Sequence, residues 1–309
     1  MQVTQAVAEP TTQAVAEPAV TDAVVVAEPA NPRKALPFGI VLHAIPFVGA
    51  HLLAIAGAIY TGVTVELVAL CAAAYFVRMF FITAGYHRYF AHRTYRTSRW
   101  FQFILALGGT TASQKGVLWW AGHHRDHHLY SDTERDIHSP VQHGFIWSHF
   151  GWILSGLYDE TPSRRIRDFV KYPELRWLNK YWMVPPVAGM GLLYVLGGLP
   201  WLVWGGLMST CILWHGTFTI NSLTHIYGSR RYATKDDSRN NLFFALITLG
   251  EGWHNNHHHY QSSANQGFFW YEIDVSFMVL RVLELFGIVW DVRRPPAQIL
   301  ACGSAARAQ

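Results

Sequence analysis

Four clusters of histidine hold the residue types in this sequence that could bind a metal. They are His87-Arg-Tyr-Phe-Ala-His92, His124-Arg-Asp-His127-His128, Asn221-Ser-Leu-Thr-His225 and His254-Asn-Asn-His257-His258. In the second and fourth clusters, the spacing i, i+3, i+4 places all three imidazoles on one face of a helix. Neutral imidazole suits iron, copper, zinc and nickel alike, so the pattern predicts a metal site without naming the metal.

The first and third clusters depend on the local backbone. On an ideal α-helix His87 and His92 would point about 140° apart, so they converge only if the helix ends or bends there. They could also serve different metals. Asn221 and His225 lie four residues apart and share one helical face, where Asn221 could hold a water or hydroxide against a metal.

The number of imidazoles predicts two metals. A single zinc ion takes about four ligands, so nine converging histidines overfill a mononuclear site. The nine are His87, His92, His124, His127, His128, His225, His254, His257 and His258. Nearby carboxylates could orient the rings by accepting their second N–H. The candidates are Asp126, Asp132, Glu134, Asp136 and Glu251.

The other histidines and the three cysteines are not predicted to bind a metal. The three cysteines form no C-x-x-C pair, so a thiolate metal site is not indicated. His123 and His259 break the i, i+3, i+4 pattern and are interpreted as surface or ring-orienting groups. His51 and His215 lie in apolar segments as hydrogen-bonded bundle histidines, and His138 is a candidate ring-orienting residue.

The segments that must position these clusters have the composition of membrane helices. Of the 309 residues, 51% are hydrophobic, 15% aromatic and only 14% charged, which suits a lipid-facing chain. About 20 apolar residues suffice to cross a bilayer. Four segments meet this requirement, near 38–60, 65–86, 183–204 and 206–227.

Basic residues are distributed asymmetrically around these segments. The turns near 60–66 and 197–206 contain no lysine or arginine, whereas basic residues flank the other end of every segment. By the positive-inside rule, both termini and the two large loops are cytoplasmic. The sequence therefore predicts an all-α integral membrane protein: four transmembrane helices form two hairpins, and a cytosolic helical cap holds a His-rich dimetal site.

Other segments are assigned by composition. Residues 1–35 are a near-repeat of Ala, Val, Glu and Pro, predicted to be a disordered extension and not a secretory signal. Residues 36–295 are the predicted membrane domain, and 296–309 a flexible tail. Helices within 99–118 and 268–290 are predicted at the membrane interface or in the cap. Arg78 is predicted to reach the cytoplasmic interface or to pair with a buried carboxylate. The modest charge of +4 argues against a nucleic-acid partner.

Taken as a set, the clusters and their flanks resemble the membrane fatty acyl desaturases, in particular the stearoyl-CoA desaturase type. The stretch from Gly85 to Tyr95 is similar to that family's H-x4-H box. His124 to His128 resembles its H-x2-H-H box, with Asp136-Ile-His138 and Ser148-His149-Phe-Gly151-Trp152 following as in the family. Asn221 to His225 and Gly250 to His258 match its last two elements, and the resemblance covers about residues 36–292.

The resemblance implies an O2-dependent oxidoreductase that introduces a cis double bond, at Δ9 by family default, into a saturated acyl-CoA. It implies two irons held by the nine histidines, with Asn221 contacting one through water. It also implies a kinked acyl tunnel lined by Gln114 and Trp152. Electrons would come from an external ferredoxin, flavoprotein reductase or b-type cytochrome.

Two departures from the animal enzymes point to a bacterial branch in the inner membrane: Asn256 replaces an aromatic residue, and a fused haem domain is absent. An acyl-lipid substrate is therefore an open alternative to acyl-CoA. The competing functions are a membrane di-iron hydroxylase or ketolase and a metal transporter. A transporter would carry its ionisable residues in mid-span, whereas most of these histidines lie outside the spans.

Overall fold

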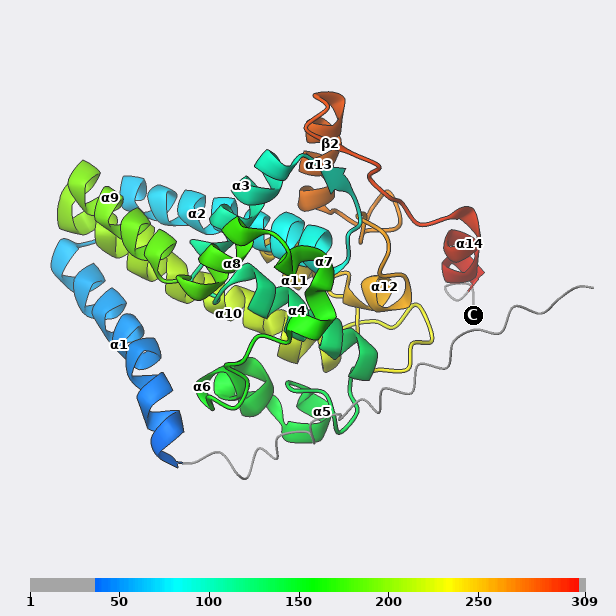
Figure 1. Cartoon of the computed structure of the whole chain (residues 1–309), viewed down its shortest axis with the longest axis horizontal. Coiled ribbons are helices and arrows are strands. Elements are labelled where there is room, and N and C mark those ends of the chain that lie inside the picture. The colour runs from blue at the N-terminus through cyan, green and yellow to red at the C-terminus, as the bar shows by residue number, and fades with distance from the viewer. Residues whose placement is uncertain (1–36, 306–309) are drawn as a thin grey trace, which may run out of the picture.

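The computed structural model describes the backbone of residues 37–305 and the side chains of residues 44–303. The predicted extension 1–35 lies outside the described residues. The described chain is mostly helical (Figure 1). Its α-helices are α1 (Pro37–Thr61), α2 (Val65–Phe80), α3 (Arg99–Thr110), α4 (Val117–Tyr130), α5 (Pro140–His143), α6 (Trp152–Leu154), α7 (Arg167–Val170), α8 (Pro173–Lys180), α9 (Val184–Trp201), α10 (Ser209–Ser222), α11 (Leu242–Ile247), α12 (His254–His259), α13 (Val275–Leu285) and α14 (Ala297–Ala305).

Several short elements connect or extend these helices. Three are π-helices, η2 (Phe81–Ala91), η3 (Trp147–Gly151) and η5 (Leu202–Met208), and two are 3-10 helices, η4 (Ser163–Ile166) and η6 (Leu223–His225). Strands β1 (Arg96–Thr97) and β2 (Val289–Trp290) pair antiparallel, with Arg96 opposite Trp290. This pair ties the chain after the first histidine cluster to the chain after α13.

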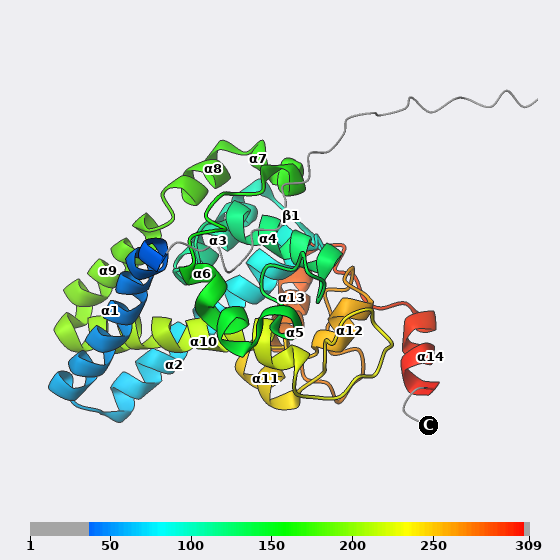
Figure 2. The same ribbon diagram turned by 90° about the horizontal axis from the view of Figure 1, so that it is seen from below.

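Three stretches of the described chain are long and apolar enough to cross a membrane: Ala44–Thr61, Val65–Ala91 and Val184–His225. Their helices α1, α2 and α9 gather at one end of the molecule, while α12, α13 and α14 lie at the other (Figure 2). The first two agree with two of the predicted segments. The third contains both remaining predicted segments in one run of 42 residues.

The 42-residue run turns back on itself at Gly198. That glycine has φ 65° and ψ −157°, a conformation outside the helical region that only glycine adopts readily, and Pro200 follows it. On either side the two arms pack together, because a Cβ placed at Gly206 would lie 3.3 Å from Met190 and one at Gly205 would lie 3.3 Å from Leu193. The run is therefore a hairpin of two apolar arms. That these arms make two separate crossings stays a prediction.

Arg78 has partners that the sequence did not indicate. Its guanidinium donates to the Thr210 hydroxyl at 2.6 Å and to the Ala74 carbonyl at 2.9 Å, and it also bonds the Ser209 hydroxyl. The predicted pairing of Arg78 with a buried carboxylate is wrong. A carbonyl of α2 and two hydroxyls of α10 accept its hydrogen bonds instead. Arg78 thus joins the two apolar hairpins.

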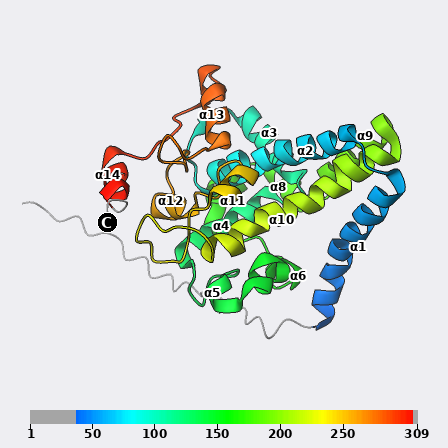
Figure 3. The ribbon, with the colours of Figure 1, turned by 180° about the vertical axis from the view of Figure 1, so that it is seen from behind.

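The cap packs around η2, which continues α2 out of the apolar bundle. Tyr86, Phe90, Leu105 and Leu178 are among its fully buried side chains and bring together η2, α3 and α8. The C-terminal α14 lies within the predicted tail 296–309, yet the Tyr232 hydroxyl donates to the Ile299 carbonyl at 3.1 Å. The described part of the tail is therefore a helix docked on the cap (Figure 3).

Candidate metal centre

Five of the predicted imidazoles meet in one group. His87 and His92 come from the end of η2, His124 and His128 from α4, and His257 from α12, and their ring nitrogens all lie within 4.8 Å of one another. Neighbouring Nε2 atoms are 3.0 Å apart along the series His92, His124, His128, His257, His87. Three segments distant in the sequence thus present the same nitrogen to a common point.

The π-helix explains why His87 and His92 converge. In a π-helix each N–H bonds to the carbonyl five residues earlier, so residues five apart stack on one face. The His92 amide donates to the His87 carbonyl at 3.1 Å, and the ring centroids are 4.8 Å apart. The sequence left open whether His87 and His92 converge on one metal. The π-helical backbone brings both rings into the same group.

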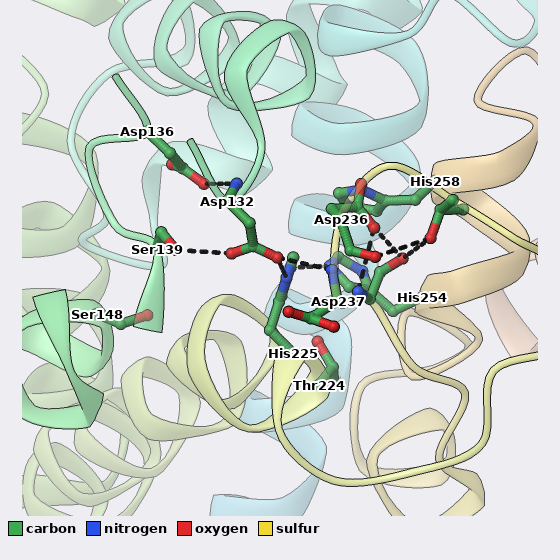
Figure 4. Close-up of polar contacts among 12 residues, drawn as sticks. Asp132, Asp136, Ser139, Ser148, Thr224, His225, Asp236, Asp237, His254 and His258 are labelled. Carbon is green, nitrogen blue, oxygen red and sulfur yellow. Dashed lines mark hydrogen bonds and ion pairs between the residues drawn. The ribbon is translucent and has the colours of Figure 1, made fainter. Parts of the chain in front are cut away.

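The other four imidazoles form a second group. His127 comes from α4, His225 from η6, and His254 and His258 from α12, again with their nitrogens within 4.8 Å of one another. All four are buried. His225 Nε2 lies 3.0 Å from His254 Nε2 (Figure 4). Because α4 and α12 each contribute to both groups, the two groups share their supporting helices.

Carboxylates orient one ring in the first group and three in the second. His127 Nδ1 donates to Asp136 at 3.0 Å. His225 Nδ1 donates to Asp132 at 2.8 Å, and His258 Nδ1 to Asp236 at 2.7 Å (Figure 4). His87 Nδ1 pairs with Glu251 in the same way. With the proton held on Nδ1, the Nε2 lone pair of each ring is free to bind a metal.

The carboxylates stay ionised despite their burial. Burial alone would raise the pKa of Asp132, but the hydrogen bond from His225 outweighs it and the pKa falls to about 2. Burial likewise opposes ionisation of Asp136 and Asp236, yet His127 and His258 hold both pKa values well below the usual range. Each carboxylate is therefore available as an acceptor.

Five of the nine imidazoles are held neutral, whereas for His127 the effect of burial is outweighed by Asp136, which raises its pKa. Burial, followed by the proximity of the other histidines, holds the pKa values of His92, His124, His128, His254 and His257 well below the ordinary value. A metal binds only the neutral ring, so this environment favours ligation at neutral pH.

Both groups fit metal ions. Ligand nitrogens about 2.1 Å from a metal and at right angles to one another are separated by roughly 3.0 Å, which matches the Nε2 spacing in the first group. His124 Nε2 faces two neighbouring Nε2 atoms at once, although a ring nitrogen has one in-plane position. His258 Nε2 is buried without a hydrogen-bond partner. A cation in each group would satisfy these atoms.

Two of the five predicted carboxylates do not serve the histidines. Asp126 pairs with Arg165, and Glu134 lies exposed in the turn after α4. Sequence reasoning missed Asp236, because a loop residue 22 positions before His258 gives no periodic signal. Gln266 was also missed; it donates to Glu251 at 3.0 Å.

We expect Asp236→Asn to weaken metal binding by the second group of imidazoles. Because the amide cannot accept the Nδ1 proton with a full negative charge, metal affinity should fall about 10- to 100-fold. The matched control is Asp237→Asn, whose carboxylate pairs with Arg230 at the surface at 3.2 Å. Metal content after dialysis against a graded chelator would measure the difference, and equal retention by both variants would contradict the role of Asp236.

A large apolar cavity adjoins the first group at His124. It has a volume of about 410 Å³, and its lining includes Gln114, Trp152, His124, His138 and Asn221. Gln114 donates to the Thr217 hydroxyl at 2.8 Å, and Trp152 stacks on Trp119 with centroids 5.7 Å apart. The two residues that the resemblance placed along a tunnel therefore lie in the wall of one cavity.

A second cavity of about 30 Å³ lies between the groups. His87 and His124 of the first group line it together with His127 and His254 of the second, and Asn221 lines both cavities. This volume holds one or two small molecules such as water. His138, which packs on His127 with ring centroids 4.4 Å apart, faces the larger cavity.

Comparisons with known proteins agree with this arrangement. A family model described as fatty acid desaturase matches residues 64–273. The sn-1 stearoyl-lipid 9-desaturase of Anabaena variabilis is 40% identical over 215 residues, which cover 69% of this chain and 78% of that protein.

Two plant proteins are similar as well. The icosanoyl-CoA 5-desaturase of Limnanthes douglasii is 40% identical over 218 residues, covering 69% of this chain and 61% of that protein. A probable chloroplastic lipid desaturase of Arabidopsis thaliana is 38% identical over 223 residues, covering 71% of this chain and 62% of that protein. The chain thus matches less than two thirds of the length of these plant relatives.

Proposed function

The chain belongs to the fatty acid desaturase family, and from this premise we propose that it introduces a cis double bond, at Δ9, into a saturated fatty acyl chain. The observation that carries the proposal is the pair of imidazole groups beside an apolar cavity of about 410 Å³. The overall reaction removes two hydrogens from the acyl chain. It consumes O2, two electrons and two protons and releases two molecules of water.

We propose that the two groups hold two iron ions, with Asn221 contacting one of them through water. Iron with O2 supplies an oxidant strong enough to attack an unactivated methylene, which zinc does not. The chain's own residues supply position. Trp120, Trp152 and Thr217 line the cavity beside His124, so they exclude water and hold one carbon–carbon bond of the acyl chain near the imidazoles.

The proposed topology follows from the charge distribution. Four crossings would place the histidines, both termini and the cap on the cytoplasmic face of a bacterial inner membrane, within a membrane domain at 36–295. Relatives are named for acyl-lipid and for acyl-CoA substrates. The substrate is therefore proposed as an acyl-CoA or an acyl lipid, and the electron donor as an external ferredoxin, flavoprotein or b-type cytochrome.

Expression in an aerobic host tests the function. We expect a new monounsaturated fatty acid by gas chromatography and mass spectrometry, absent when the host expresses His127→Ala at the same level. The fragmentation pattern gives the bond position. A hydroxy or keto acid in place of the alkene would move the assignment to a hydroxylase or ketolase. Unchanged lipids, despite iron-loaded protein and an added electron donor, would contradict the proposal.

A further inference from the structure

Helix α1 forms a wall one helix thick beside the acyl cavity. Its inner side contributes Pro46, Phe47 and Ala50 to the cavity lining. Its outer side is apolar and exposed, with Leu52 and Leu53 each 63% exposed. If α1 crosses the membrane as proposed, this outer side faces lipid, so α1 alone separates the cavity from the bilayer at this point.

The C-terminal end of α1 is firmly anchored. Trp204 Nε1 donates to the Thr61 hydroxyl and to the Gly62 carbonyl, both at 3.2 Å. Ala54 is buried, and a Cβ placed at Gly57 would lie 2.6 Å from a methyl carbon of Val203, so the helices touch here. In Figure 3 this end of α1 lies beside α2 and α9, whereas its other end runs past α6.

A chain of three imidazoles holds the other part of α1. His51 Nε2 lies 3.1 Å from His215 Nε2 on α10, and His215 Nδ1 lies 3.0 Å from His149 Nε2 on η3. Among the described side chains of α1 before Ala54, this contact is the one side-chain hydrogen bond to another element. The remaining contacts there are ring packing, such as Phe47 on Trp214 at 5.4 Å between centroids.

The hydrogen bond between His51 and His215 forms with both rings neutral. His51 Nδ1 donates to the Phe47 carbonyl at 2.7 Å, so its Nε2 must accept from His215. His215 Nδ1 then accepts from His149 Nε2, and His149 Nδ1 lies 2.9 Å from the Ser222 hydroxyl, which donates to the Phe218 carbonyl at 2.8 Å. Separating His51 from His215 leaves two ring nitrogens without partners, so the contact favours a closed α1.

We propose that the His51–His215 contact is a latch that keeps α1 closed over the cavity, and that its opening admits the acyl chain of a bilayer lipid sideways. The inference rests on the proposed function and specifies its substrate class. The lining of the large cavity suits the apolar chain of a lipid. Among its described residues Lys115 is the one lysine or arginine, and Lys115 is already paired with Asp159. A hydrogen bond between helices in a membrane is weak enough to open repeatedly.

Cross-linking tests the latch directly. The variant carries His51→Cys and His215→Cys, with Cys211 and Cys302 replaced by serine, in nanodiscs of deuterated phospholipid. A short bifunctional thiosulfonate bridges the new pair, and mass spectrometry verifies the bridge. We expect bridging to lower both desaturation of the nanodisc lipid and exchange of bound lipid at least tenfold, with recovery after reduction.

The matched control bridges the anchored end. Gly57→Cys with Val203→Cys brings the two Cβ atoms to about 3.4 Å, close to disulfide geometry. This bond should leave lipid desaturation and exchange within twofold of the unbridged protein. A further variant, His51→Phe, should exchange bound lipid several-fold faster than the wild type at equal metal content.

The outcomes separate the latch from the proposed function. Unchanged lipid exchange in the bridged latch variant overturns the latch, as does conversion of soluble acyl-CoA with no conversion of lipid in the unbridged protein. Lipid exchange does not depend on turnover. If exchange responds to the bridge while no substrate is desaturated even by the wild type, the latch stands and the proposed function fails.

Discussion

Replacement of His257 by alanine is expected to remove one metal ion per chain and to abolish desaturation. His257 Nε2 is 3.0 Å from His87 Nε2 and 3.0 Å from His128 Nε2, so it joins the η2 and α4 parts of the five-imidazole group. Loss of a residue that only orients a ligand typically lowers metal affinity or activity about 10- to 100-fold. Loss of the ligand itself should exceed that range.

Metal analysis and the fatty-acid profile measure this effect together. The wild type should carry about two metal ions per chain, one for each imidazole group as proposed, and His257→Ala about one. His143→Ala is the control, because His143 lies in α5 outside both groups. If His257→Ala kept both metals and made the alkene at the control's rate, the five-imidazole group would not be a metal site.

The periodic histidine clusters could be predicted because their geometry is local. In α4 and α12 the spacing i, i+3, i+4 fixes the relative direction of three rings whatever the rest of the chain does. His124, His127 and His128 nevertheless separate in the structure, since His127 belongs to the second group and the other two to the first. Periodicity therefore identified the rings, and long-range packing decided how they are shared.

The π-helix and the distant carboxylates lay beyond a sequence argument. Nothing in the periodicity of Phe81–Ala91 distinguishes hydrogen bonds to residue i−5 from the usual pattern, and that choice decides whether His87 meets His92. Asp236 reaches His258 through a loop whose path depends on the Tyr232 and Asn255 contacts, at 2.7 Å between the Tyr232 amide and the Asn255 side-chain oxygen. Such contacts form only when the whole chain folds, so the spacing of residues along the sequence does not predict which residues are partners.

The apolar segments show what hydropathy predicts and what it leaves out. Hydropathy predicts which segments can lie in a membrane, and the segment predicted near 65–86 falls within the apolar stretch Val65–Ala91. Hydropathy alone does not reveal which polar side chains satisfy one another inside the bundle. Arg78 with Thr210, and His51 with His215, are contacts between hairpins that only the folded chain brings together.

Replacement of Arg88 by methionine is expected to destabilise the protein by about 3–5 kcal/mol, the range for breaking a buried ion pair from one side. Arg88 is 1% exposed, and it donates to Asp274 at 2.8 Å and to Glu251 at 3.1 Å. Methionine fills similar volume but leaves two buried carboxylates without a cation. Since Glu251 also receives the Nδ1 proton of His87, the variant should lose metal from the first group as well.

A double-variant cycle tests this origin of the effect. Asp274→Asn removes one of the stranded charges while keeping the side-chain size, so Arg88→Met with Asp274→Asn should lose less free energy of unfolding than the two single changes added together. Arg99→Met is the surface control. Arg99 pairs with Glu174 at 2.8 Å but is 63% exposed in its side chain, so its loss should cost far less free energy of unfolding than the loss of Arg88.

Denaturant unfolding in detergent, followed by tryptophan fluorescence, gives these free energies with metal-depleted and metal-loaded protein. A loss by Arg88→Met that appears only with metal bound would place its role in the metal site alone. A loss in both forms, larger with metal, is the expected result, because the buried charges are stranded whether or not the imidazoles hold metal and the variant also binds metal less tightly in the first group. Additive single changes would instead show that Arg88 and Asp274 act independently, contrary to the contact between them.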